Sequence, residues 1–190
     1  IGYSFIYPGV GYGGSCFPKD VKALTKIAEE NGYTAELITA VEQVNDAQKL
    51  VIAQKIVKRF GEDLTGLTFG IWGLSFKPGT DDMREAPAIY VIKELVKRGA
   101  KIKAYDPKAI NEAKEHYLKG VQNITYVTSK YDVLNNSDAL VLLTEWKEFR
   151  SPDFDKIKSL LKSPIIFDGR NQYIVYDLEN KGLEYYRIGK

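Results

Sequence analysis

After residue 66 the sequence alternates short apolar segments with segments whose apolar residues recur every three or four positions. The segments with strand character are 67–74, 101–106, 124–127, 139–144, 164–168 and 183–189. The segments with helical character are 88–99, 107–118, 131–136 and 154–162. This alternation predicts an α/β domain with a mostly parallel sheet and right-handed crossovers. Segment 139–144 is apolar enough to be buried on both faces, and 183–189 is expected to be an edge strand.

The sequence before residue 62 follows a different pattern. Residues 1–15 hold five glycines and one proline, too many for a helix or an interior strand, so a loop is expected there. A first helix is predicted from about Pro18, which suits a first helical turn, to the stop signal Asn31-Gly32. A second helix, capped by Thr34, meets no Gly or Pro before Phe60, and its expected length is about 40 Å.

An apolar stripe at helical spacing runs along the long predicted helix. Its members are Leu37, Val41, Val44, Ala47 or Gln48, Val51, Ile52 and Ile56. One small domain does not cover a stripe of this length, so we expect a homodimer formed through this helix. The chain is therefore divided into a loop and helical dimerisation segment, 1–62, and an α/β domain, 63–190.

Ligands of parallel sheets bind beyond the carboxyl ends of the strands. The segments expected at that edge are 74–84, 106–107, 144–146 and 168–171. The first turn from strand to helix reads Gly70-Ile71-Trp72-Gly73, which is not the G-x-G-x-x-G fingerprint of dinucleotide binding. A Rossmann-like domain that is not itself an NAD site fits this pattern.

Composition excludes several classes of function. The formal net charge is +2 and the 13 tyrosines are scattered without a basic stripe, which argues against a nucleic-acid partner. The only histidine, His116, has no second ligand nearby in the sequence, so no metal site is expected. A single cysteine indicates a reducing compartment, and no apolar run approaches the roughly 20 residues of a membrane span. We expect a cytoplasmic protein, or a piece of a longer one, with no membrane partner.

The single thiol, Cys16, follows Gly13-Gly14 and precedes Pro18, Lys19 and Asp20, where a helix is expected to begin. A thiol at a helix N-terminus beside a lysine is placed to form a thiolate, and the glycines allow backbone amides to approach a ligand. The alternative is a buried, inert cysteine. Residue spacing alone does not decide between the two readings.

Two long motifs, FIYPGVGYGGSCFPKD (5–20) and GLSFKPGTDDMREAP (73–87), with TEW (144–146) and FDGRN (167–171), resemble the UDP-glucose/GDP-mannose dehydrogenase family. The resemblance extends over essentially the whole chain. It is greatest to members that oxidise UDP-glucose, and members that oxidise GDP-mannose remain the close alternative. Family members begin with an NAD-binding domain, which would precede this chain. The resemblance therefore implies the C-terminal part of a longer enzyme, a fragment or processed product that is inactive alone.

The resemblance also implies a reaction. The family oxidises the C6 alcohol of the sugar to a carboxylate, giving UDP-glucuronate from UDP-glucose, with NAD as cofactor. A cysteine holds the substrate as a thiohemiacetal and then as a thioester, which water hydrolyses. Cys16 matches this nucleophile, and Asp20 matches an aspartate that orients or activates the water. Without the resemblance, Asp20 is more simply a first-turn carboxylate that interacts with the helix dipole.

The remaining site residues follow from the same resemblance. Those that match substrate-binding positions are Phe5, Ile6, Tyr7, Pro8, Gly9, Gly13, Phe76, Lys77 and Arg170. Those that match positions reaching NAD are Lys19 and Arg84. Taken from residue chemistry alone, Lys19, Lys77 and Arg84 are solvated surface charges, and Arg170 is nearly as well explained by a plain turn.

Two other classes of function compete with the enzyme. One is a non-catalytic module that binds a nucleotide sugar and dimerises. The other is a thiol-based redox protein built on its single cysteine, which leaves residues 73–87 unexplained.

Overall fold

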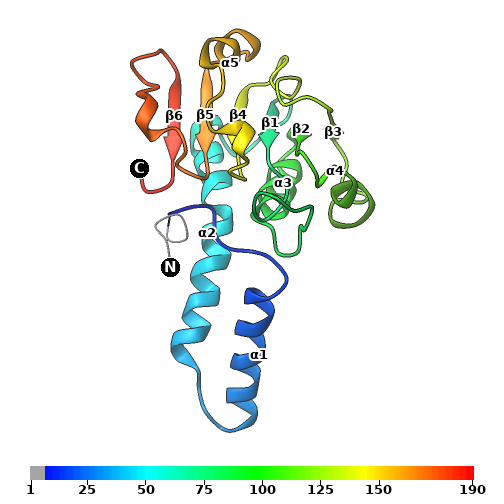
Figure 1. The fold of residues 1–190 in the computed structure, drawn as a ribbon, viewed down its shortest axis with the longest axis vertical. Helices are drawn as coiled ribbons and strands as arrows, with labels where there is room; N and C mark the ends of the chain where they lie inside the picture. Colours follow the sequence, from blue (N-terminus) through cyan, green and yellow to red (C-terminus); the bar gives the residue numbers. More distant parts are fainter. Residues whose placement is uncertain (1–6) are drawn as a thin grey trace.

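The computed structural model describes residues 7–190, and its centre is a six-stranded, wholly parallel sheet (Figure 1). The strands are β1 (Thr68–Trp72), β2 (Lys101–Tyr105), β3 (Ile124–Tyr126), β4 (Ala139–Leu142), β5 (Ile165–Asp168) and β6 (Glu184–Arg187). Their order across the sheet is β3-β2-β1-β4-β5-β6, the doubly wound Rossmann arrangement. The predicted α/β class is confirmed, and β6 lies at the sheet edge as expected.

Side chains of the central strands alternate between two apolar cores, one on each face of the sheet. On β4, Ala139 and Val141 enter the core shared with α3 (Pro87–Lys97) and the end of α2 (Glu36–Phe60). Leu140 and Leu142 enter the core on the opposite face, beside α5 (Phe154–Leu160). All four positions of β4 are buried, so the predicted burial on both faces is confirmed.

Helices α1 (Phe17–Glu30) and α2 form a hairpin whose tip extends away from the sheet (Figure 1). The second half of α2 packs into the core through Ile52, Ala53 and Ile56. The first half carries apolar side chains that remain exposed, including Leu37 and Val44. The predicted helices are present, but Ala35 rather than Thr34 occupies the N-cap of α2, and no side chain caps it.

Two predicted helices differ from the structure. Segment 131–136 forms consecutive turns, with amides bonded three residues back and Asn136 at φ 57°, because it is too short to propagate a helix. Segment 107–118 is helical only at α4 (Ile110–Glu112) and a π-helical turn (Ala113–Tyr117). The Asp106 carboxylate accepts the amides of Lys108 and Ala109, both at 2.9 Å, ahead of the first helical residue, Ile110. Within residues 7–190, no helix is long and apolar enough to cross a membrane.

Candidate functional site

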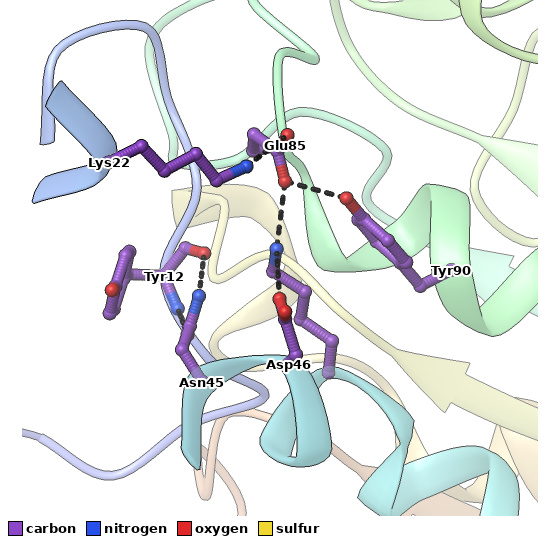
Figure 2. Close-up of polar contacts among 7 residues, drawn as sticks. Tyr12, Lys22, Asn45, Asp46, Glu85 and Tyr90 are labelled. Carbon is purple, nitrogen blue, oxygen red and sulfur yellow. Dashed lines mark hydrogen bonds and ion pairs between the residues drawn. The ribbon is translucent and has the colours of Figure 1, made fainter. Parts of the chain in front are cut away.

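The glycine-rich loop before α1 lies across α2 and is clamped there by two amide side chains. The side-chain oxygen of Asn45 accepts the backbone N–H of Tyr12 at 2.7 Å, and its NH₂ group donates to the Tyr12 carbonyl at 3.2 Å (Figure 2). Farther along α2, Gln48 donates to the Gly9 carbonyl at 2.6 Å. These contacts join segments more than 30 residues apart and fix the loop that leads to the thiol.

The loop then meets the segment between β1 and α3. The N–H of Gly14 donates to the Arg84 carbonyl at 2.7 Å. A Cβ on Gly14, which has φ +97°, would lie 2.8 Å from the Phe76 ring, and a Cβ on Gly13 would lie 2.4 Å from the Glu85 carbonyl oxygen. Glycine is required at both positions because a larger residue would separate the two segments.

Cys16 occupies the N-cap of α1 and is exposed to solvent. The reading of Cys16 as a buried residue is therefore wrong, and its reactivity stays a prediction. The Ser15 hydroxyl lies 3.6 Å from the sulfur, and the Asp20 amide donates to the Cys16 carbonyl at 2.9 Å. Lys19 and Asp20 are exposed and form an ion pair at 3.3 Å, so both are accessible within one helical turn of the thiol.

Three predicted residues share the segment between β1 and α3. The exposed Lys77 ammonium lies 5.2 Å from the centroid of the Phe76 ring. Arg84 binds the Asp82 carboxylate through two nitrogens, at 3.0 and 2.8 Å. The hydrogen bonds that Arg84 donates to the Asp82 carboxylate raise the pKa of Arg84.

The N-terminal loop contacts Arg170 and its neighbour Asn171 in the segment that follows β5. Arg170 pairs with Glu145 through Nη2 and Nε, both at 2.8 Å from carboxylate oxygens. Gly9 packs directly on this guanidinium, since a Cβ there would lie 2.4 Å from it. The Tyr7 hydroxyl donates to the Asn171 carbonyl at 3.3 Å. Pro8 is exposed beside this contact, whereas Phe5 and Ile6 lie outside the described residues.

Asp106, at the end of β2, ties three of the expected edge segments together. Its buried carboxylate accepts the amide of Leu74 at 2.7 Å and the indole N–H of Trp146 at 3.0 Å. Thr144 in turn donates to the Ser75 carbonyl at 2.6 Å. Segments 74–84, 106–107 and 144–146 are thus joined at the carboxyl edge of the sheet. Because protein donors occupy both oxygens of Asp106, this carboxylate is not free for a ribose.

A polar cluster behind the thiol loop was not predicted. Glu85 accepts hydrogen bonds from Lys49 at 2.9 Å, Tyr90 at 2.6 Å and Lys22 at 3.4 Å (Figure 2). The Tyr90 hydroxyl and the Lys49 ammonium lower the pKa of Glu85 to about 2. Burial and the Glu85 carboxylate raise the pKa of Tyr90 to about 12. The cluster joins α1, α2, α3 and the segment after β1.

The residues that sequence reasoning missed are Asn45, Gln48, Lys49, Glu85 and Glu145. One signal was present, because asparagine is unfavourable in a helix interior unless its side chain has a specific partner. Asn45 sits in the middle of α2 and is buried.

Comparisons with known proteins agree with the motifs. Residues 70–174 match the UDP binding domain of the UDP-glucose/GDP-mannose dehydrogenase family, and residues 1–47 match its central domain. The chain is 43% identical to a UDP-glucose 6-dehydrogenase of Pseudomonas aeruginosa and 40% identical to one of Rhizobium meliloti, over its whole length. It spans only 42% and 43% of those relatives.

A solved structure gives the same result. A UDP-glucose dehydrogenase from the hyperthermophilic archaeon Pyrobaculum islandicum superposes on 94% of this chain, and on 38% of its own, with a TM-score of 0.78 and 30% identity. The resemblance inferred from the motifs is confirmed. Since the match to the UDP binding domain alone covers more than half of the residues, the chain belongs to the UDP-glucose/GDP-mannose dehydrogenase family.

Proposed function

We propose that this chain is the part of an NAD-dependent UDP-glucose 6-dehydrogenase that binds the nucleotide sugar and carries the nucleophile. The observation that carries the proposal is the contact between Gly14 and Arg84, which holds the exposed Cys16 next to the segment bearing Lys77. A thiol two residues from that contact can reach a sugar whose diphosphate is bound at the sheet edge. The names of the relatives support UDP-glucose as the sugar nucleotide.

In the proposed binding mode, Lys77 attracts the diphosphate as an exposed cation at the carboxyl end of β1. The aromatic ring of Phe76 and the loop of Tyr7, Pro8, Gly9 and Gly13 cover the sugar. Arg170 is already paired with Glu145, so the ion pair fixes the position from which its guanidinium group contacts the ligand. Phe5 and Ile6 remain proposed members of the same loop.

Cys16 is the proposed nucleophile. Its thiolate adds to the C6 aldehyde carbon of the oxidised sugar, and the carbonyl oxygen takes a proton to give a thiohemiacetal. After oxidation of that adduct to a thioester, water attacks the acyl carbon, the C–S bond breaks, and the carboxylate leaves as the thiolate returns. Asp20 is proposed to orient and deprotonate this water from one helical turn away.

When bound, NAD would supply the hydride acceptor, and two NAD molecules would be used in turn, one for each oxidation at C6. Lys19 and Arg84 are exposed cations beside Cys16, and this donor set suits phosphate or ribose oxygens. The turn after β1 carries no dinucleotide fingerprint, and Asp106 is occupied by protein donors. We therefore expect NAD to be held mainly by a separate dinucleotide-binding region, and the 190 residues alone not to turn over.

The proposed assembly is a homodimer formed through the hairpin of α1 and α2, with residues 1–62 as its helical segment and 63–190 as the substrate domain. Exposed apolar side chains cluster on that hairpin at Leu24, Ile27, Tyr33, Leu37, Val41 and Val44. Burial of such a surface against a second copy is favourable. A cytoplasmic location is proposed as well, because the mechanism needs a reduced cysteine.

Calorimetry with the purified chain tests the substrate assignment. UDP and UDP-glucose should bind without NAD. If the site discriminates between uracil and guanine, GDP-mannose should bind at least about tenfold more weakly. Tighter binding of GDP-mannose would transfer the assignment to the family's other substrate class. Absence of binding by either nucleotide, in a chain shown to be folded, would contradict the proposed function.

A further inference from the structure

Glu85 adopts a backbone conformation that is unfavourable for its residue type. Its φ is +53°, in the left-handed region that residues with a side chain rarely adopt and where their backbone is strained. No glycine supplies this turn, so other interactions must hold it in place. The carboxylate is bound by an ammonium from α2, a hydroxyl from α3 and an ammonium from α1.

The left-handed turn determines which groups face the thiol loop. It presents two successive carbonyls, those of Arg84 and Glu85, toward Gly14 and Gly13. The Arg84 carbonyl accepts the Gly14 amide at 2.7 Å, and the Glu85 carbonyl leaves no room for a Cβ on Gly13. These contacts occur two and three residues before Cys16. A change in the Glu85 backbone would therefore move the support of the thiol.

Lys49 is the most buried partner of Glu85, with 2% of its side chain exposed. A buried ammonium requires a carboxylate, and Asp46, at 3.4 Å, is itself largely exposed. The Lys49 stem also borders the thiol loop, since a Cβ on Gly11 would lie 3.3 Å from its Cγ. The ammonium lies 4.3 Å from the centroid of the Tyr90 ring. One side chain thus touches the loop, α3 and Glu85.

We propose that Lys49 and Glu85 are positioning residues, which hold the Cys16 loop in register with the segment that carries Lys77 and Arg84. Neither residue needs to touch the substrate. They act through the Glu85 backbone, so that a ligand held by Lys77 has its sugar next to the sulfur. This inference rests on the proposed function for the identity of the ligand, but the register itself is a property of the free chain.

The test uses the single thiol of the purified chain. Alkylation of Cys16 by iodoacetamide is followed by intact mass, alone and with saturating UDP-glucose or UDP, and the hydrogen exchange of the Gly14 amide is measured in parallel. The variants are Lys49→Met and Glu85→Gly. Glycine accepts φ +53° without strain, so the second variant removes the carboxylate while easing the backbone. Lys49→Arg tests rescue by charge. Arg59→Met, which breaks an exposed ion pair with Glu184 at 2.6 Å, is the matched control.

Lys49→Met and Glu85→Gly should exchange the Gly14 amide roughly tenfold faster than the wild type, because the loop opens locally, whereas alkylation of the already exposed Cys16 in the free chain should change little. Bound UDP-glucose should slow the alkylation of Cys16 in the wild type and in Lys49→Arg. In Lys49→Met and Glu85→Gly it should slow alkylation by less than about twofold. UDP affinity and the exchange of β1 and β4 amides should stay unchanged, which a general loss of stability would not allow.

Two failures can be told apart. If Gly14 exchange and the protection of Cys16 by UDP-glucose in Lys49→Met and Glu85→Gly equal those of the wild type and of Arg59→Met, the positioning role is wrong. If the variants loosen the loop as expected but UDP-glucose neither binds nor protects the wild type, the positioning role stands and the proposed substrate is wrong.

Discussion

The backbone N–H of Asp20 donates to the carbonyl oxygen of Cys16 at 2.9 Å, so the proposed nucleophile and the proposed water-orienting carboxylate lie one helical turn apart. Both residues are exposed, and Lys19 pairs with Asp20 at 3.3 Å. This arrangement places a thiol, a carboxylate and a cation on one accessible helix end. It allows the two chemical roles to be separated by substitution.

Cys16→Ser should abolish formation of UDP-glucuronate in an enzyme that joins this chain to a dinucleotide-binding region. A hydroxyl is a much weaker nucleophile than a thiolate at neutral pH, and any ester that forms hydrolyses slowly. Mass spectrometry after incubation with UDP-glucose and NAD should show either unmodified protein or a retained sugar ester. Production of UDP-glucuronate at the wild-type rate would mean that the cysteine is only structural.

Asp20→Asn should have the opposite signature. The thiol still forms its adduct, but hydrolysis of the thioester slows because the amide cannot take a proton from water. The covalent intermediate should therefore accumulate on Cys16, and hydroxylamine should release it. Lys26→Ala, at an exposed position on the same helix, is the control. If the intermediate never exceeds its wild-type level while turnover is unchanged, Asp20 only interacts with the helix dipole.

Lys77→Ala should weaken UDP binding by about 1–3 kcal/mol, the scale of one charge-assisted contact. The side chain is exposed and its contact is a cation–π interaction with the Phe76 ring, so the fold should tolerate its removal. Isothermal titration of the purified chain measures the difference. Equal affinities of the variant and the wild type would remove this lysine from the site.

The sheet could be predicted because its buried strands carry near-continuous apolar sequence, which only a two-sided environment requires. The helical stripe was also visible, although the structure divides it: Ile52 and Ile56 are buried in the core, whereas Leu37 and Val44 are exposed. The cross-strand contacts of the Asp106 carboxylate could not be predicted, because its partners Leu74 and Trp146 come from other strand ends.

The candidate site divides in the same way. The motif around Cys16 has a local signature, since glycines, a thiol and a helix start are adjacent in sequence. Its support by Asn45, Lys49 and Glu85 depends on contacts between residues 33 or more positions apart. Polar residues within a helix usually indicate its solvent-facing side. Hydrophobic periodicity therefore does not show which polar residues are buried with a partner.

Acid should destabilise the wild type through Glu85. Its folded-state pKa of about 2 lies below the ordinary 4.5, so its stabilising effect is complete above about pH 4.5 and is lost as the pH falls toward 2. Lys49, Lys22 and Tyr90 are the groups that favour its charged form, and Asp46 faces the same ammonium. Between pH 7 and pH 3, the free energy of unfolding should fall by about 1–2 kcal/mol more in the wild type than in Glu85→Gln, after allowance for solvent screening.

Urea denaturation at the two pH values measures this difference. Glu29→Gln, at an exposed position on α1, controls for the removal of one surface carboxylate. Identical pH dependence in the wild type and Glu85→Gln would show that the cluster does not favour the charged carboxylate.

The hairpin of α1 and α2 should mediate self-association. Leu37 is 79% exposed and Val44 is 68% exposed, about two turns apart on the same helix, and no other part of the described chain covers them. Leu37→Glu with Val44→Glu should convert a dimer into a monomer, because two charges on each copy would have to be desolvated at the interface. Sedimentation velocity at micromolar concentration measures the change.

Val175→Glu, at an 83% exposed apolar position outside the hairpin, should leave the dimer intact. A wild-type chain that sediments as a monomer across this concentration range, or a double variant that remains dimeric, would exclude the hairpin as the interface.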